Sequence, residues 1–377
     1  MRRRVSPPGG GRGRHVRVRA RARPALLLPL AALGGWALLG PGGWAEELLA
    51  LWVSRGAGPA PAPGPGPAPL PPPPRLAGVP PGVPAPCGRR GAPFLLVLVS
   101  SAPAHRARRE AIRATWGSRR RARGRRVRTL FLLGREGAAE ALARRDVVAA
   151  DFRDAYRNLT RKTLSGLAWA AARCPGARYV LKTDDDVYVN VGGLVDELLG
   201  RGAPRGDDPL TPGADRRRAP RGAAGRPPLY LGRVHWRVWP SREAGGRHEV
   251  SEALYPPGLG PFPPYASGTG YVLSAAAVRL VLAGAGAVPP LPLEDVFVGL
   301  SARRGGLAPA HCPRLAGAAH FPPDRCCHGR VLLTVHRVGP GEMARVWDLV
   351  RGPGPLCSPL QAALGLLRCR ALAWLRG

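Results

Sequence analysis

The chain is poor in acidic residues, asparagine and lysine. Its 377 residues include 24 Asp and Glu against 57 Lys and Arg; Arg supplies 55 of these 57, and Asn occurs twice. A net charge of +33 ordinarily suggests nucleic-acid binding. The arginines are instead spread along the chain, as GC-rich codon usage acting on tolerant surface positions would spread them, and few aromatic side chains lie between them to stack on bases. We therefore expect no nucleic-acid partner.

Several common site motifs are also absent. There is no Gly-x-Gly-x-x-Gly sequence and no Walker loop, so neither a dinucleotide site nor a P-loop is supported. The seven cysteines have no zinc-type spacing. In an oxidising compartment most of them should form disulfides, with one left free or paired between chains, and adjacent Cys326 and Cys327 are not expected to pair with each other. The remaining connectivity is open.

The N-terminal part predicts a membrane anchor. Residues 1–23 carry nine Arg and no acid, and residues 24–45 then run for 22 residues without a charge. As a helix, the uncharged segment would be about 33 Å long, enough for a bilayer core of about 30 Å. The basic flank favours a cytoplasmic tail over residues 1–23, a transmembrane signal anchor over 24–45 and a lumenal remainder, a type II topology. A cleaved signal peptide is the alternative; the segment is long for one, and no small-x-small cleavage site follows it cleanly.

A proline-rich stem should follow the anchor. Fourteen Pro occur among the 31 residues 56–86, a composition that cannot bury a core and favours an extended chain. We assign residues 46–92 to this stem and 93–377 to a lumenal domain. The sequon Asn158-Leu-Thr, which contains one of the two Asn residues, agrees with a lumenal location and predicts N-glycosylation of Asn158.

Strand-like and helix-like patterns alternate along this domain, which predicts an α/β fold with a mainly parallel sheet. In such folds ligands bind at the carboxyl ends of the strands. Residues 200–226, rich in Arg, Pro and Gly, are expected to form a mobile loop near the site. Residues 360–375 form an apolar helix that lies on the membrane or packs on the domain. The expected strands cover 94–101, 127–134, 179–183, 229–236 and 331–337, and the expected helices cover 105–116, 160–173 and 191–199.

Three adjacent carboxylates, Asp184, Asp185 and Asp186, end the strand that starts at Tyr179. They repel one another unless a hard divalent cation such as Mg²⁺ or Mn²⁺ binds them, and such a cation commonly holds nucleotide phosphates. A calcium-binding EF-hand loop is excluded, because Val189 and Val195 stand where that loop needs Gly and Glu. A solvated acidic turn and a phosphatase with an aspartyl nucleophile are the alternatives.

Further candidates lie downstream. Glu294 and Asp295 interrupt an apolar run, so one of them is either a general base with a raised pKa or a helix N-cap. The segment 262–271 contains Gly268, which could let the backbone approach a ligand or simply form a tight turn. Two late histidines, His320 and His336, are candidate metal ligands.

Taken together, these segments resemble the animal β-1,3-glycosyltransferases, glycosyltransferase family 31. The resemblance covers most of residues 93–350, with its pieces in the order of the family. The matching pieces are Glu110-Ala-Ile-Arg-Ala-Thr-Trp-Gly, Tyr156-Arg-Asn-Leu-Thr, Lys182-Thr-Asp-Asp-Asp-Val-Tyr-Val-Asn, Tyr265-Ala-Ser-Gly-Thr-Gly-Tyr and Glu294-Asp-Val.

The resemblance implies a GT-A fold, a UDP-sugar donor, Mn²⁺ and inversion at the anomeric carbon. It implies that Asp186, Asp184 and His336, in preference to His320, bind the metal, and that Asp295 is the catalytic base. The donor-binding residues that it implies are Arg109, Arg113, Lys182, Asp184 and Asp185, and the acceptor-binding residues are Trp236, Tyr265, Gly268 and Glu294.

The finer likeness, carried by stretches such as Gly232-Arg-Val-His-Trp-Arg and Asp324-Arg-Cys-Cys, is to family members that act on gangliosides. It implies transfer of galactose from UDP-galactose to the 3-hydroxyl of a terminal N-acetylgalactosamine on a ganglioside-type glycolipid, at the Golgi membrane. Ala266 stands where many relatives carry Cys, so a relative's disulfides cannot be copied onto this chain. The alternatives are transfer of galactose or N-acetylglucosamine to glycoprotein glycans, and an inactive lumenal glycan-binding protein. An oligomer is possible.

Overall fold

The computed structural model describes residues 87, 91–201 and 227–376. The predicted cytoplasmic tail, membrane anchor and nearly all of the stem lie outside these residues, as does most of the predicted loop at 200–226. Among the described helices, none combines the length and the apolarity needed to cross a bilayer.

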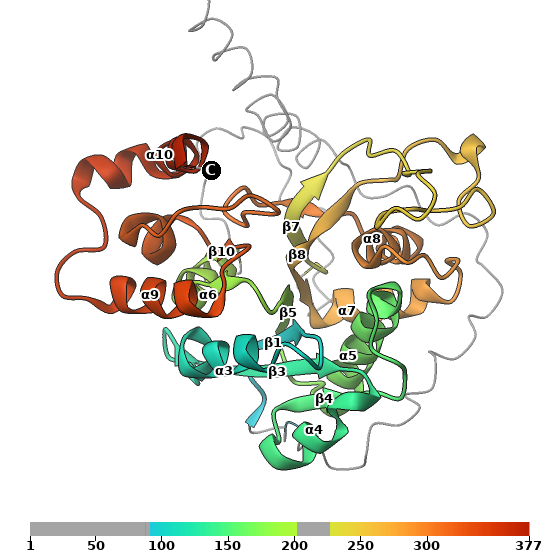
Figure 1. Ribbon diagram of the computed structural model, residues 1–377, viewed down its shortest axis with the longest axis horizontal. Coiled ribbons are helices and arrows are strands. Elements are labelled where there is room, and N and C mark those ends of the chain that lie inside the picture. Colours follow the sequence, from blue (N-terminus) through green and yellow to red (C-terminus); the bar gives the residue numbers. More distant parts are fainter. Residues whose placement is uncertain (1–86, 88–90, 202–226, 377) are drawn as a thin grey trace, which may run out of the picture. The chain divides into compact units, whose positions relative to one another are not determined.

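Strands and helices alternate through the first half of the domain, as the sequence predicts (Figure 1). The strands are β1 (Leu95–Ser100), β2 (Arg121–Ala122), β3 (Arg125–Leu133), β4 (Val147–Ala149), β5 (Tyr179–Asp184), β6 (Tyr188–Val189), β7 (Tyr230–His235), β8 (Tyr265–Ser274), β9 (Ala310–His311) and β10 (Thr334–Val335). The α-helices are α3 (Arg106–Ala114), α4 (Ala138–Arg144), α5 (Leu159–Arg173), α6 (Val191–Gly200), α7 (Ala275–Ala285), α8 (Glu294–Arg304), α9 (Pro340–Arg351) and α10 (Pro359–Arg376). Short helical turns are η2 (Trp116–Ser118), η3 (Arg135–Gly137), η4 (Tyr156–Asn158), η5 (Pro257–Leu259) and the π-helical η6 (Cys327–Val331).

The central sheet is mixed rather than mainly parallel. Its strands follow the order β2-β3-β1-β5-β8-β7-β9, and β4 pairs with β3. β1 is parallel to both β3 and β5, whereas β8 is antiparallel to both β5 and β7. The difference arises at residues 265–274, which form a ten-residue strand instead of a turn or a ligand-binding loop.

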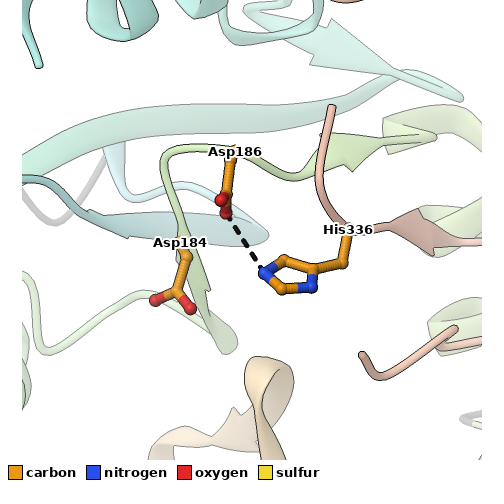
Figure 2. A group of neighbouring side chains, drawn as sticks. All are labelled: Asp184, Asp186 and His336. Atoms are coloured by element: carbon orange, nitrogen blue, oxygen red, sulfur yellow. Dashed lines mark ion pairs between the residues drawn. The ribbon is translucent and has the colours of Figure 1, made fainter. Parts of the chain in front are cut away.

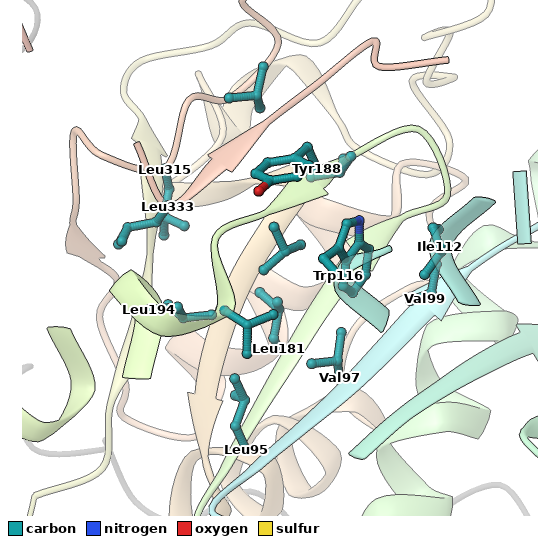
Figure 3. Packing of buried hydrophobic residues seen from close by; sticks show 14 of the residues in the cluster. Leu95, Val97, Val99, Ile112, Trp116, Leu181, Tyr188, Leu194, Leu315 and Leu333 are labelled. Carbon is teal, nitrogen blue, oxygen red and sulfur yellow. The ribbon is translucent and has the colours of Figure 1, made fainter. Parts of the chain in front are cut away.

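The sheet is covered on both faces, which explains its continuous apolar strands. Along β1, Leu95, Val97 and Val99 enter a cluster that includes residues of α3, α6 and α9 (Figure 3). The intervening Leu96 and Leu98 enter a second cluster with residues of α5, α7 and α8. Because side chains alternate along a strand, one six-residue strand contributes to both layers.

Three disulfides confirm the expectation that most cysteines pair. Cys87 pairs with Cys174 beside the start of the domain. Cys326 pairs with Cys357 and Cys327 pairs with Cys369, while Cys312 is free and buried. The adjacent cysteines thus bind two different partners near α10.

Helix α10 packs on the domain with one side and exposes apolar side chains on the other. Leu366, Cys369 and Leu372 join the first core cluster, and the helix bends at Gly365, whose φ is 47°. The exposed large side chains of this helix are Leu360, Leu364, Leu367, Trp374 and Leu375. The packed-helix alternative is therefore observed, and contact of this helix with a membrane stays a prediction.

Candidate metal and sugar-nucleotide site

The Asp triplet lies at the carboxyl end of β5, beside the end of β1, where the register pairs Ser100 with Asp184. Its middle member, Asp185, points toward the loop after β1. Its carboxylate accepts hydrogen bonds from Ser101 Oγ in that loop at 2.7 Å and from Arg108 of α3 at 2.9 Å, and lies 2.8 Å from His105 Nδ1. Asp185 is 4% exposed, so these contacts account for a buried carboxylate.

A small second sheet brings His336 to the outer two carboxylates. Strand β10 pairs antiparallel with β6, with Thr334 opposite Val189 and Val335 opposite Tyr188. This pairing places the residue after β10 next to the residues before β6. Oxygen and nitrogen atoms of Asp184, Asp186 and His336 lie within 4.8 Å of one another, and His336 Nε2 is 3.4 Å from Asp186 Oδ1 (Figure 2).

The other candidate histidine is not part of this cluster. His320 Nε2 lies 3.3 Å from Glu342 Oε1, at the first turn of α9. The structure therefore brings His336, and not His320, to the aspartates.

The donor set fits a divalent transition-metal ion. Asp186 Oδ1 and His336 Nδ1 are buried and make no hydrogen bond among the described residues. Burial alone would raise the pKa of Asp186, but His336 and Arg108 outweigh it and lower that pKa, so the carboxylate is ionised. Two carboxylates with one imidazole suit Mn²⁺ better than Ca²⁺ or Mg²⁺, which favour all-oxygen ligand sets.

Lys182 connects Asp184 to Glu294, a member of the second acidic pair. It is 4% exposed, and its Nζ lies 2.9 Å from Asp184 Oδ1, 3.0 Å from Glu294 Oε2 and 2.7 Å from the carbonyl oxygen of Gly268. Burial would lower the pKa of Lys182, but the carboxylates of Asp184 and Glu294 reverse the effect and raise it. The ammonium group is thus a fixed positive charge between β5, β8 and α8.

Glu294 and Asp295, at the start of α8, have different surroundings. Glu294 is buried, contacts Lys182 and accepts a hydrogen bond from the hydroxyl of Tyr271 at 2.5 Å. Burial raises its pKa, and Lys182 opposes that rise. Asp295 is partly exposed, and its two carboxylate oxygens accept hydrogen bonds from the amides of Gly268 at 3.0 Å and Val296 at 2.9 Å.

Neither acidic residue is the N-cap of α8, which is Leu293, and the role of Asp295 as a base stays a prediction. Its carboxylate bonds backbone amides at a helix N-terminus, and it also faces a cavity. Gly268 makes this approach possible, because an added Cβ would lie 3.2 Å from Asp295 Oδ2 and 3.3 Å from Glu294 Oε2.

The Asp triplet and the second acidic pair line one cavity of about 870 Å³, a volume typical of small-molecule sites. The predicted site residues on its lining are Lys182, Asp184, Asp185, Asp186, Tyr265, Gly268, Glu294, Asp295 and His336. Trp236 is not among the described residues that line it, whereas Trp239, 67% exposed, is.

Two predicted donor-binding arginines are engaged elsewhere. Arg109 is 1% exposed and pairs with Glu140 at 2.5 Å while also donating to Ser101 Oγ at 3.0 Å. Arg113 pairs with Glu140 and Asp146, each at 2.8 Å. Neither lines the cavity within the described part of the chain; they bind α3 to α4 and to the loop before β4.

Arg108 was not predicted as a site residue. It lies beside the Asp triplet, where Arg109 and Arg113 were expected. Its guanidinium lies 2.9 Å from Asp185 and 3.2 Å from Asp186, and it lines the cavity. Burial would lower the pKa of Arg108, but hydrogen bonds and charge from these aspartates raise it. The available signal was its helical position, since a helix turns about 100° per residue and adjacent arginines point in different directions.

Three further residues on the cavity were missed. Lys162 is 2% exposed and lies 2.6 Å from Asp154 Oδ1, and burial lowers its pKa despite that carboxylate. Tyr156 and Arg247 contact each other at the rim. The sequence offered a signal for Lys162, because it is one of only two lysines in the chain.

The sequon lies at the start of α5, next to this rim. Asn158 Nδ2 donates to the carbonyl oxygen of Arg153 at 2.8 Å. Thr160 is buried and its hydroxyl donates to the carbonyl oxygen of Leu291 at 2.7 Å. Glycosylation of Asn158 stays a prediction.

Comparison with known proteins extends these observations. The model of the galactosyltransferase family matches residues 107–313. The β-1,3-galactosyltransferase 4 of Mus musculus is 54% identical, with 93% of this chain and 98% of that protein covered, and the Homo sapiens protein of the same name is 53% identical, with 94% and 98% covered. The acetylgalactosaminyl-O-glycosyl-glycoprotein β-1,3-N-acetylglucosaminyltransferase of Homo sapiens is 36% identical, with 73% of this chain and 70% of that protein covered.

Proposed function

Because the chain belongs to the galactosyltransferase family, we propose that it transfers galactose from UDP-galactose to the 3-hydroxyl of a terminal N-acetylgalactosamine on a ganglioside-type glycolipid. The observation that carries this proposal is the single cavity onto which the Asp184–Asp186–His336 cluster and the carboxylate of Asp295 both open. High identity to β-1,3-galactosyltransferase 4 over nearly the whole chain supports the choice of sugar and linkage.

Asp184, Asp186 and His336 would hold Mn²⁺. The chemistry that the ion supplies when bound is neutralisation of the diphosphate on the departing UDP. Lys182 holds the carboxylate of Asp184 in place through its contact at 2.9 Å. Arg108 adds a positive charge next to Asp186, where it can reach a diphosphate oxygen.

Asp185 acts through the residues that it binds. Its contacts with Ser101, His105 and Arg108 fix the loop after β1 against the metal-facing carboxylates. That loop lines the cavity, so Asp185 positions the donor-binding surface, and buried Arg109 supports it from the other side through Ser101.

Asp295 is the base. The amides of Gly268 and Val296 orient its carboxylate, which accepts the proton of the acceptor hydroxyl as that oxygen attacks the anomeric carbon. Attack opposite the leaving UDP converts an α-linked donor into a β-linked product without a covalent enzyme intermediate. Tyr265, on the same cavity, offers an aromatic face to the acceptor sugar.

The proposed location is the Golgi membrane, with a type II anchor at 24–45, a stem at 46–92 and a lumenal GT-A catalytic domain at 93–377. Three disulfides in the described residues agree with an oxidising lumen. In this arrangement the catalytic domain meets a glycolipid acceptor anchored in the same membrane.

The test is a transfer assay with the full chain in detergent, UDP-galactose and Mn²⁺, with and without a chelator. The acceptors are an N-acetylgalactosamine-ended ganglioside, an N-acetylglucosamine-ended glycan and a β-galactoside, and UDP-N-acetylglucosamine serves as a second donor. We expect metal-dependent transfer of galactose to the ganglioside. Transfer of the other sugar, or to another acceptor alone, would retain the mechanism and reject this substrate assignment. UDP binding without any transfer would instead support a glycan-binding protein.

A further inference from the structure

One part of the cavity has no role in the mechanism above. It is formed by Tyr156 of η4 and by Arg247 and His248 of the connection between β7 and β8, the yellow segment of Figure 1. The connection packs on the domain through its own cluster, in which Val250, Tyr255 and Phe262 meet residues of α8. Arg247 therefore lies on an anchored segment.

Arg247 is exposed, and its guanidinium contacts an aromatic ring. Its guanidinium carbon lies 4.6 Å from the centre of the Tyr156 ring, a cation–π contact. No carboxylate forms an ion pair with it among the described residues. Two other described arginines line the cavity: Arg108 is paired with two aspartates, and Arg337, which follows His336, likewise forms no ion pair within the described residues.

Tyr156 and Arg247 line the same cavity as Asp295. Burial raises the pKa of Tyr156, Arg247 opposes the rise, and the negative charges of Asp295 and Asp184 add to it. An acceptor whose hydroxyl contacts Asp295 would extend its neighbouring groups toward this rim.

We propose that Arg247, supported by the ring of Tyr156, is a binding site for a carboxylate of the acceptor glycan, such as that of a sialic acid. A guanidinium matches a carboxylate with two parallel hydrogen bonds, and stacking on an aromatic ring leaves its N–H edge available. This inference rests on the proposed function, and it adds that the enzyme prefers acidic over neutral acceptors of the same core.

The experiment compares a sialylated acceptor with its desialylated counterpart, using the full chain in detergent with UDP-galactose and Mn²⁺. In Arg247→Ala, we expect KM for the sialylated acceptor to rise about 10-fold to 100-fold, the range for a hydrogen bond to a charged group, with kcat little changed. The preference for the sialylated over the desialylated acceptor should fall by the same factor. Arg247→Lys retains the positive charge but lacks the planar guanidinium. It should recover part of the preference for the sialylated acceptor.

Arg157→Ala is the matched control. It removes the same charge from the residue next to Tyr156, yet Arg157 is exposed and is not among the described residues lining the cavity. Its acceptor preference should equal that of the wild-type protein. High salt should reduce the wild-type preference, because exposed charges are screened.

Two outcomes would overturn the inference while leaving the proposed function intact. One is a rise in KM for UDP-galactose in Arg247→Ala, which would assign the guanidinium to the donor diphosphate. The other is an unchanged ratio between the two acceptors. Failure of the wild-type protein to use either acceptor would instead overturn the proposed function itself.

Discussion

Asp184, Asp185 and Asp186 are chemically identical, but the strand end gives them different partners. The middle carboxylate is buried against Ser101 and Arg108, and the outer two lie with His336. The strand ends at Asp184 and the next two residues form a turn, so the three side chains meet different neighbours. Substitutions of the three residues should therefore give different phenotypes.

We expect Asp186→Asn to lose both metal-dependent UDP binding and transfer, because it removes a charged metal ligand. Asp295→Asn should bind UDP and metal as the wild-type protein does, but its kcat should fall about 10²-fold to 10⁴-fold, the usual contribution of a general base. Calorimetric titration with UDP and Mn²⁺ measures binding, and the transfer assay measures kcat. Together they distinguish Asp186→Asn from Asp295→Asn. A wild-type rate in Asp295→Asn would remove that residue as the base.

Lys182 should matter for stability as much as for catalysis. Lys182→Met leaves the buried carboxylate of Glu294 without its cation, and breaking a buried pair in this way costs about 3–5 kcal/mol. Urea unfolding should show this loss in the free energy of unfolding. Adding Glu294→Gln should restore part of it, since the double variant buries no uncompensated charge; additive losses would show that the pair is not coupled.

At the scale of elements, adjacent cysteines fasten the segment around α10. Cys326–Cys357 holds the chain before the helix and Cys327–Cys369 holds its middle, while Arg368 pairs with Asp324 at 2.7 Å. The outer side of the helix buries little apolar surface. The two disulfides therefore hold α10 in place where packing contributes little.

Replacing these four cysteines with Ala should lower the free energy of unfolding by at least the 2–5 kcal/mol typical of one native disulfide. It should also open the helix to trypsin at Arg368 and Arg370, as mass spectrometry of the fragments would detect. Cys312→Ala, which removes a free buried thiol, is the control and should cleave as the wild-type protein does. Equal cleavage of all three proteins would show that packing alone holds α10.

The same region should make stability depend on pH. His328, in η6, has its pKa lowered from 6.5 to about 4 by burial, and its ring meets that of Tyr188 edge-on. Because the folded-state pKa is the lower one, the unfolded state binds the extra proton first. Stability is then complete above pH 6.5 and declines as the pH falls toward 4, by up to about 3 kcal/mol.

His328→Phe keeps an aromatic ring in this position and should flatten the stability profile between pH 6.5 and 4. Denaturant unfolding across that range measures the difference from the wild-type protein. His248→Gln, at an exposed histidine for which no ion pair is found within the described residues, is the control and should retain the wild-type slope. An identical slope in His328→Phe would mean that other groups cause the decline.

For the whole molecule, ligand binding should couple to folding through the metal cluster. UDP at a concentration 100-fold above its Kd should stabilise the protein by about 2.7 kcal/mol, which raises Tm by several degrees. We expect this shift only with Mn²⁺ present, and a chelator should abolish it. Asp186→Asn should show no shift, and a full shift without metal would contradict the assigned cluster.

The sequence predicted what depends on local pattern. The strand from Tyr179 and the helices near 160–173 and 191–199 were found within about a residue, because their apolar spacing is strong. The direction of β8 could not be predicted, since it depends on which strand its backbone pairs with. Residues 331–337 gave only the two-residue β10, preceded by a π-helical turn.

Within the site too, local sequence pattern does not show which distant segments come together. The Asp triplet indicated a metal site from charge alone, whereas His336 came from family resemblance and is explained by the β6–β10 pairing. Arg109 was taken from the family resemblance, and Arg108 was missed because the side of α3 that faces the cavity depends on how the helix packs on the domain. Arg247 gave no local signal, because its position depends on the folding of a long connection.

The scarcity of lysine has a chemical consequence. The chain has only two lysines, and both Lys162 and Lys182 are buried on the cavity, with exposed fractions of 2% and 4%. Amine-directed reagents, which modify surface lysines on most proteins, therefore find no exposed side-chain target here. Slow acylation of these two amines would report the opening of the cavity in solution, and crosslinking of this protein to its neighbours must rely on carboxyl or guanidinium chemistry.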